Sequence, residues 1–290
     1  MKPKPDRIPP DPAVILERSR GVFFAQWEEL LRLRRSVLKT SDLDDIHDLR
    51  VASRRLRAAL ELFEPVAPKT PIKELRKNIR SLTSSLGGLR NIDEALLFFR
   101  SRITTDATII HNLLALLAKN RSRELNRINK ALVTFDHRHL DRMVREIVAS
   151  MNEISINKRD SFSLLAYFSD VSIRRYSTIY QHLAGSIAPE RRESRHALRI
   201  GIKKWRYFLE TIATVVDRDY SALLGELKEY QSILGQMNDI AEFEMLLGTI
   251  ELPPDERAHV EAILRAEDAL LLMSFTEIIE SKPLSYSFLI

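Results

Sequence analysis

The chain has 290 residues, no cysteine and only eight glycines, and 44% of its residues are hydrophobic. This composition favours helices around a substantial core, and it excludes disulfides, thiolate metal sites and cysteine nucleophiles. The formal net charge is only +5, so an anion-binding function must rest on how the cations are arranged. No stretch approaches the roughly 18–20 apolar residues that span a bilayer, and the start lacks the apolar segment of a signal peptide. We therefore expect a cytoplasmic protein without a membrane partner.

The periodicity of apolar residues predicts an all-α fold. Residues 1–12 are expected to form a disordered, proline-rich arm, followed by a first helical bundle over 13–152 and a second over 160–282. The polar, aperiodic residues 152–160 are expected to be the linker. A glycine pair, Gly87-Gly88, is expected to break the third helix. The helices of the first half are predicted at about 13–39, 45–63, 72–86, from 89 onward, 107–133 and 140–151.

The stretch 45–63 is an amphipathic helix with two distinct faces. Its apolar face is expected to pack into the core and comprises Leu49, Ala52, Leu56, Ala59, Leu60 and Phe63. On the other face His47, Arg50, Arg54, Arg57 and Glu61 follow one another at spacings of three and four residues. Like charges one turn apart destabilise an isolated helix. An anionic ligand is the simplest reason for such a row.

The second half of the chain repeats this row at an offset of 149 residues. His196, Arg199, Lys203, Arg206 and Glu210 match the row above, and Lys204 matches Arg55. Downstream, Leu86-Gly-Gly-Leu89 matches Leu234-Gly-Gln-Met237 at an offset of 148. The pattern indicates a tandem duplication. Two pseudo-symmetric bundles related by an approximate two-fold axis would bring both rows together in a basic central cavity.

These motifs resemble the CHAD domain, the conserved histidine α-helical domain. The first half carries His47-x-x-Arg-Val-x-x-Arg-Arg-Leu-Arg57 and then Leu86-Gly-x-Leu-Arg-x-x-Asp93, and the second carries the paired motifs at 196–207 and 234–239. The resemblance covers residues 12–282. It implies an all-α fold of two pseudo-symmetric bundles with a basic cavity that binds inorganic polyphosphate. It also implies association with polyphosphate granules.

Carried onto this chain, the resemblance together with the repeated rows gives a set of expected polyphosphate-binding residues. They are His47, Arg50, Arg54, Arg55, Arg57, Lys73, Arg76, Arg80, Arg90, His196, Arg199, Lys203, Lys204, Arg206 and Lys228. A linear anion suits cations spaced one helical turn, about 5.4 Å, apart. Arginine matches phosphate oxygens with a fork of donors, whereas lysine acts as a point charge.

Several roles stay open at this point. His47 and His196 either contact phosphate or act as capping or core residues. Glu61 and Glu210 either orient an arginine or, with the two histidines, hold a metal ion in a phosphohydrolase. A nucleic-acid-binding protein is a further alternative, although no aromatic residues interleave with the basic rows.

Other residue types are interpreted as structural. No sequence motif of a known catalytic site is found, so we expect a binding protein without a cofactor or a resident metal. Asp93 and Asp239 are interpreted as caps beside glycine turns. The pair His111 and His259 is expected to have a core or helix-packing role. The two tryptophans, Trp27 and Trp205, are expected in the core as well.

Overall fold

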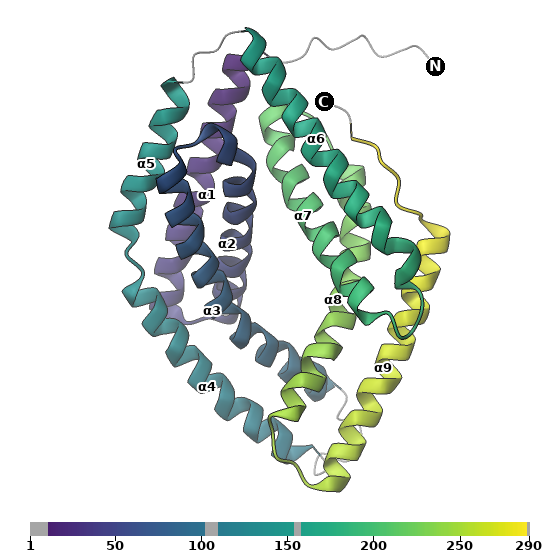
Figure 1. Cartoon of the computed structure of the whole chain (residues 1–290). Helices are drawn as coiled ribbons and strands as arrows, with labels where there is room; N and C mark the ends of the chain where they lie inside the picture. The colour runs from purple at the N-terminus through teal and green to yellow at the C-terminus, as the bar shows by residue number, and fades with distance from the viewer. Residues whose placement is uncertain (1–10, 102–109, 154–157, 289–290) are drawn as a thin grey trace.

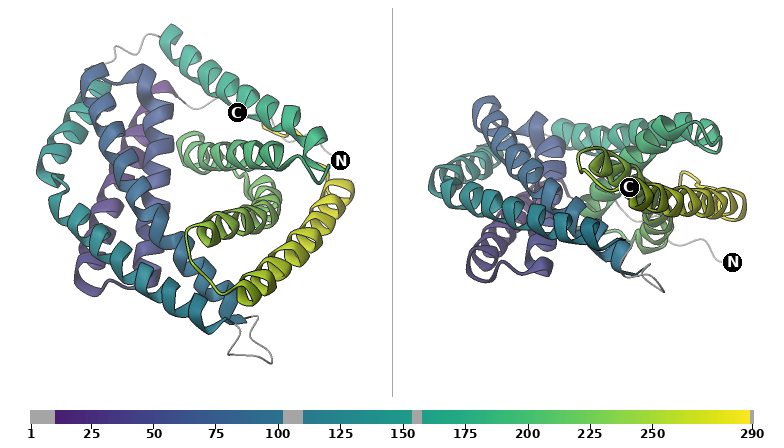
Figure 2. Two further views of the ribbon diagram at one scale, coloured as in Figure 1. Left: turned by 60° about the horizontal axis from the view of Figure 1, so that its bottom comes forward. Right: turned by 90° about the horizontal axis from the view of Figure 1, so that it is seen from below.

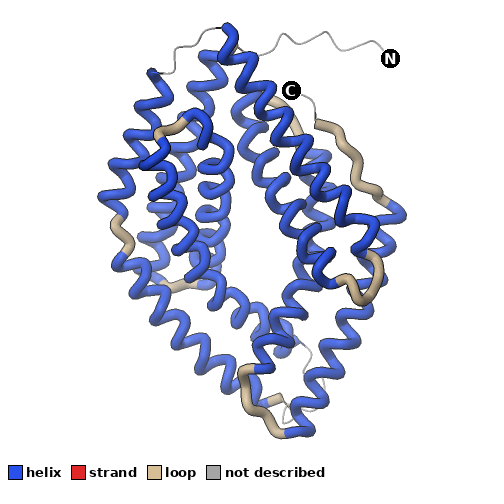
Figure 3. Tube along the Cα trace, viewed as in Figure 1, coloured by secondary structure: helices blue, strands red, loops and turns tan. Residues whose placement is uncertain are grey.

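The computed structural model describes residues 11–101, 110–153 and 158–288, and this part of the chain folds into nine α-helices with no strand (Figure 3). Two single 3-10 turns, at 64–66 and 184–186, follow α2 and α6. The helices are α1 Pro12–Thr40, α2 Leu43–Phe63, α3 Lys69–Ser101, α4 His111–Thr134, α5 His137–Glu153, α6 Lys158–Leu183, α7 Arg192–Val216, α8 Ser221–Gly248 and α9 Pro254–Ser281.

The helices lie in two groups, α1–α5 and α6–α9, with α2 and α7 on the inner sides (Figure 1). Within the first group α2 packs on α3 and α3 on α4, and the same succession recurs as α7 on α8 and α8 on α9. Between the groups, α2 packs on α7 and α3 on α8. In the left view of Figure 2, α4 and α5 lie along the outer side of the first group, and α6 and α9 lie along the outer side of the second. This succession is what a duplicated unit would give.

One continuous core joins the two groups, because buried apolar residues of all nine described helices contact one another. The predicted apolar face of α2 is buried throughout, and Trp27 and Trp205 are fully buried, as predicted. Their ring nitrogens donate hydrogen bonds to Asp141 at 3.0 Å and to Ser172 at 3.1 Å. The all-α fold class is confirmed.

Polar and aromatic contacts also cross between the groups near the ends of α3 and α4. Asn91 on α3 donates to Glu242 on α8 at 2.8 Å, and the rings of Phe98 and Phe243 lie 5.3 Å apart. The buried carboxylate of Glu256 on α9 accepts the backbone N–H of Leu113 at 2.9 Å, in the first turn of α4. A carboxylate at this end of a helix satisfies free N–H groups and matches the helix dipole.

The third helix differs from its prediction, because α3 runs unbroken through Gly87-Gly88 from Lys69 to Ser101. Buried Leu86 and Leu89 flank the pair, so packing of the helix outweighs the glycines' low helix propensity. Helix α5 begins at His137 and ends at Glu153, and α6 begins at Lys158. Of the predicted linker 152–160, residues 154–157 lie outside the described residues. Most of the predicted arm, and the predicted helix start at about 107, lie outside the described residues.

The histidine pair His111 and His259 is exposed, so the prediction that it packs in the core was wrong. In the first turns of α4 the buried positions are Leu113 and Leu117, whereas His111 is exposed. On α9 the neighbour Val260 is buried instead. Both histidines are next to apolar residues in sequence but lie outside the buried stripe of their helix.

Candidate functional site

The basic row of α2 is half-buried. His47, Arg50, Arg54 and Arg57 are each of intermediate exposure. Their placement follows from the buried Leu49 and Leu56 on the same helix, which fix the rotation of α2 and turn the row toward α7. Burial and the neighbouring Arg90 guanidinium lower the pKa of His47 below its ordinary value.

The basic row of α7 lies opposite. Arg199, Lys203 and Arg206 are half-buried, whereas His196 is exposed and its Nδ1 lies 2.9 Å from Oδ1 of Asn238 on α8. Buried Leu198, Ile202 and Trp205 hold the other face of α7 in the core. The matched rows therefore sit on two helices in contact.

Cations of the two rows act on one another. Burial, and then Arg54, Arg90 and Arg199, lower the pKa of Arg50 to about 10. Burial, and then Arg199, Arg54 and Arg50, lower the pKa of Lys203 to about 6. Arg199 acts on Arg50 across from α7, Arg54 and Arg50 act on Lys203 across from α2, and Arg90 acts from α3. The five residues therefore form one group, which we call the central cationic cluster: Arg50, Arg54, Arg90, Arg199 and Lys203.

Carboxylates lie against this cluster: Glu94 of α3 forms an ion pair with Arg90, and Asp239 of α8 interacts with four of the five residues. Burial raises the pKa of Asp239, and the cations Arg199, Lys203, Arg90 and Arg50 oppose that rise. The interpretation of Asp93 and Asp239 as caps was wrong, because both lie inside unbroken helices. Asp239 is thus an internal counter-ion that offsets part of the repulsion among the cations.

The cluster also holds donors without partners. The Nε atoms of Arg50 and Arg199 are buried and have no hydrogen-bond partner among the described residues. A buried donor left unpaired costs free energy of about 1–3 kcal/mol. Two such donors lie on facing helices within a group of cations. An anion bound between them could accept a hydrogen bond from each.

The glutamates that end the two rows pair with arginines. Glu210 lies 3.2 Å from Arg55 of α2 and 3.4 Å from Arg206, and Glu61 lies 3.8 Å from Arg175 of α6. Two of these ion pairs cross between the groups of helices. Two roles were considered for these glutamates, orienting an arginine or holding a metal ion. Their arginine partners fit the first role.

The remaining expected residues lie further out. Lys73, Arg80, Lys204 and Lys228 are exposed. Arg76 donates to Glu64 at 2.5 Å. Among the expected residues of α3, Arg90 is the one that acts on the central cationic cluster. The arginines of α3 therefore lie in different surroundings: Arg76 pairs with Glu64, whereas Arg90 lies in the central cationic cluster.

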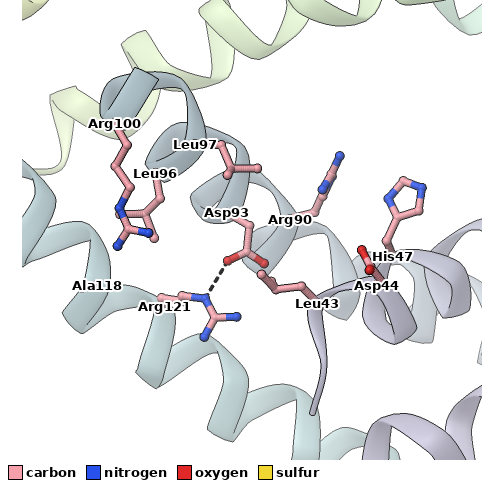
Figure 4. Close-up of a pocket in the computed structure, with 10 residues that line it drawn as sticks. All are labelled: Leu43, Asp44, His47, Arg90, Asp93, Leu96, Leu97, Arg100, Ala118 and Arg121. Atoms are coloured by element: carbon pink, nitrogen blue, oxygen red, sulfur yellow. Dashed lines mark hydrogen bonds and ion pairs between the residues drawn. The ribbon is translucent and has the colours of Figure 1, made fainter. Parts of the chain in front are cut away.

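A pocket of about 730 Å³ opens beside the cluster, between α2, α3 and α4 (Figure 4). His47 and Arg90 line it together with two arginines outside the expected binding set, Arg100 and Arg121. Arg121 donates to Asp93 at 2.7 Å. The signal that could have found Arg100 is the row Arg90, Asp93, Leu97 and Arg100 at spacings of three and four, which lies within the helix predicted from 89 onward. The pocket is lined by Leu43, Asp44, His47, Arg90, Asp93, Leu96, Leu97, Arg100, Ala118 and Arg121.

Two searches of the described residues complete the geometry. They contain no group of three or more His, Cys, Asp or Glu side chains placed to hold a metal ion. Within the same residues, no helix is both long and apolar enough to cross a bilayer.

Together, the fold and the site define an all-α protein in which two facing helices carry a shared cationic cluster. The chain belongs to the CHAD domain family, whose model, described as "CHAD domain", matches residues 21–248. Its helical arrangement is similar to that of a solved structure titled "Crystal structure of the CHAD domain from the plant Ricinus communis". That comparison gives 24% identity and a TM-score of 0.63 over 93% of this chain and 88% of the other.

A second solved structure, "PptA from Streptomyces chartreusis", shares the fold with a TM-score of 0.64. Its identity is 14% over 92% of this chain and 99% of the other. Both likenesses therefore concern the fold. No curated protein matches this chain.

Proposed function

We propose that the protein binds inorganic polyphosphate through the basic rows of α2 and α7, and that it acts as a binding protein rather than as an enzyme. The observation that carries this proposal is the central cationic cluster, in which Arg50 and Arg199 present buried Nε donors from opposite helices. Membership of the CHAD domain family supports it. The proposal includes a cytoplasmic location and association with polyphosphate granules through the same residues.

The physical match lies in charge density. Placing several guanidiniums together at low exposure is unfavourable unless an anion compensates them, and the same anion favours the charged form of the Lys203 amine beside them. A polyphosphate chain supplies about one negative charge per unit, and its oxygens accept hydrogen bonds from forked arginine donors. A single phosphate would neutralise only part of the cluster.

The test is a competition titration of long-chain polyphosphate against duplex DNA at about 0.15 M salt. We expect polyphosphate to displace DNA and to bind more weakly as salt rises, by analogy with counterion release. The paired variant Arg50→Gln with Arg199→Gln should lose polyphosphate affinity while its helical circular dichroism is unchanged. Preference for DNA would favour the nucleic-acid alternative instead.

The phosphohydrolase alternative has a separate test. Phosphate release from polyphosphate would be assayed with Mg²⁺ or Mn²⁺ in the wild type and in His47→Gln and Glu61→Gln variants. We expect no release above the protein-free control. For the granule association, a fluorescent fusion should coincide with polyphosphate staining, and the Arg50→Gln with Arg199→Gln variant should be diffuse.

A further inference from the structure

The pocket between α2, α3 and α4 lies at the first-half end of the central cationic cluster. Arg90, Asp93, Leu97 and Arg100 follow one another along one side of α3, and Arg121 faces them from α4 (Figure 4). Arg100 is exposed, and Asp93 holds Arg121 by an ion pair of 2.7 Å. Three arginines and His47 outnumber the two carboxylates, Asp44 and Asp93, among the lining residues.

Two residues belong to both the pocket and the cluster environment. Arg90 lines the pocket and at the same time lowers the pKa of Arg50. His47 lines the pocket, and its pKa is lowered by Arg90, Arg50 and Arg54 after burial. A ligand that leaves the cluster past Arg90 therefore enters the pocket without crossing an uncharged gap.

The corresponding end of the second half is closed. At the sequence offset of 149, Leu43 corresponds to Arg192, whose guanidinium lies 2.5 Å from Glu244 of α8 and 2.7 Å from Asp268 of α9. This bridge ties three helices together, and the cavity beside His196 holds only about 50 Å³.

The arginines that line the pocket of the first half have no counterparts there. At the offset of 148 the row Arg90, Asp93, Leu97 and Arg100 becomes Asn238, Ala241, Met245 and Gly248, and Arg121 becomes Ala269. The two ends of the cluster therefore differ in both space and charge.

We infer that the pocket between α2, α3 and α4 is a second anion subsite that receives one end of a polyphosphate chain running out of the central cationic cluster. The inference rests on the proposed function and adds a direction and a length requirement to it. Ten residues of helix separate Arg90 from Arg100, a rise of about 15 Å. Tripolyphosphate cannot span that distance while it also contacts Arg50 and Arg199, whereas a long chain can.

The experiment compares the affinities of tripolyphosphate and long-chain polyphosphate at fixed ionic strength. Arg100→Gln should weaken long-chain binding by roughly fivefold, which is the upper range for an exposed charge contact, and Arg100→Glu should weaken it further. Tripolyphosphate affinity should change by less than about twofold in both variants. Arg100 forms no ion pair among the described residues, so these variants leave the Asp93–Arg121 pair intact.

Arg123→Gln and Arg123→Glu are the matched controls, because Arg123 is exposed on α4 but does not line the pocket. They should leave both affinities unchanged. Unaltered long-chain affinity in Arg100→Glu, or an equal loss for both ligands, would overturn the subsite. Failure of the wild type to bind either ligand would instead refute the proposed function, and so would undiminished binding by Arg50→Gln with Arg199→Gln.

Discussion

Lys203 is the residue whose charge the fold controls most strongly. Its pKa is about 6, against an ordinary value of 10.5. Burial is the largest cause of this shift, because it disfavours the charged amine. The charges of Arg199 on the same helix and of Arg54 and Arg50 on α2 lower the pKa further. Asp239 of α8 is the one carboxylate that opposes this shift among its principal neighbours. At neutral pH the ligand-free protein therefore holds this amine largely uncharged.

A bound polyanion favours the ammonium form, so it raises the pKa of Lys203. Between pH 6 and the higher pKa of the complex, binding takes up a proton and affinity falls as pH rises. We expect polyphosphate affinity to increase as pH falls from 8 to 6, and Lys203→Arg to flatten most of this dependence. His47, whose pKa is also lowered, would account for the remainder, which His47→Gln should remove.

The measurement is a binding titration at fixed ionic strength, with calorimetry in buffers of different ionisation enthalpy to count protons. A flat profile in the wild type would contradict proton uptake at this site. An unchanged slope in Lys203→Arg would assign the uptake to another group.

At the level of single helices, replacing a glycine by alanine is expected to have opposite effects on stability in α3 and in α7. A Cβ added at Gly87 meets nothing within 4 Å, whereas one added at Gly201 lies 3.1 Å from Cγ1 of Ile179 on α6. Gly87→Ala should raise the free energy of unfolding by about 0.5–1 kcal/mol, because α3 is helical there. Gly201→Ala should lower it by about 1 kcal/mol through overpacking.

Thermal and urea unfolding of both variants would test this contrast. Gly225→Ala is a control for Gly87→Ala, since it is also helical and meets nothing within 4 Å. If Gly87→Ala instead destabilised the protein, the glycine at this position would be required for a reason other than its low helix propensity.

The sequence predicted the position of α2 but not the continuity of α3 through the same glycine pair. Periodicity placed α2 correctly, with every predicted apolar residue buried, because one amphipathic helix carries its own pattern. The break at Gly87 was wrong because contacts from other helices decide whether α3 continues. The role of Asp239 was missed for the same reason: its cationic neighbours lie on α2, α3 and α7.

At the scale of the whole molecule, the repeated rows predict two basic helices, but only the packing of α2 on α7 makes them one site. Arg54 of the first half lowers the pKa values of Arg199 and Lys203 of the second. Arg55 and Glu210 join the same two helices by an ion pair of 3.2 Å. The sequence alone left open whether the rows face one another.

One shared site has a consequence that two independent sites would not have. We expect one central polyphosphate site per chain, measured with short chains by calorimetry. Arg54→Glu should weaken this site without changing the stoichiometry, and Arg54→Glu combined with Lys203→Glu should abolish binding while helicity is retained. Neighbouring residues that contact one ligand are not energetically independent, so the losses from Arg54→Glu and Lys203→Glu should differ from additivity by more than about 0.5 kcal/mol. A stoichiometry of two that Arg54→Glu reduces to one would mean that each half binds its own anion.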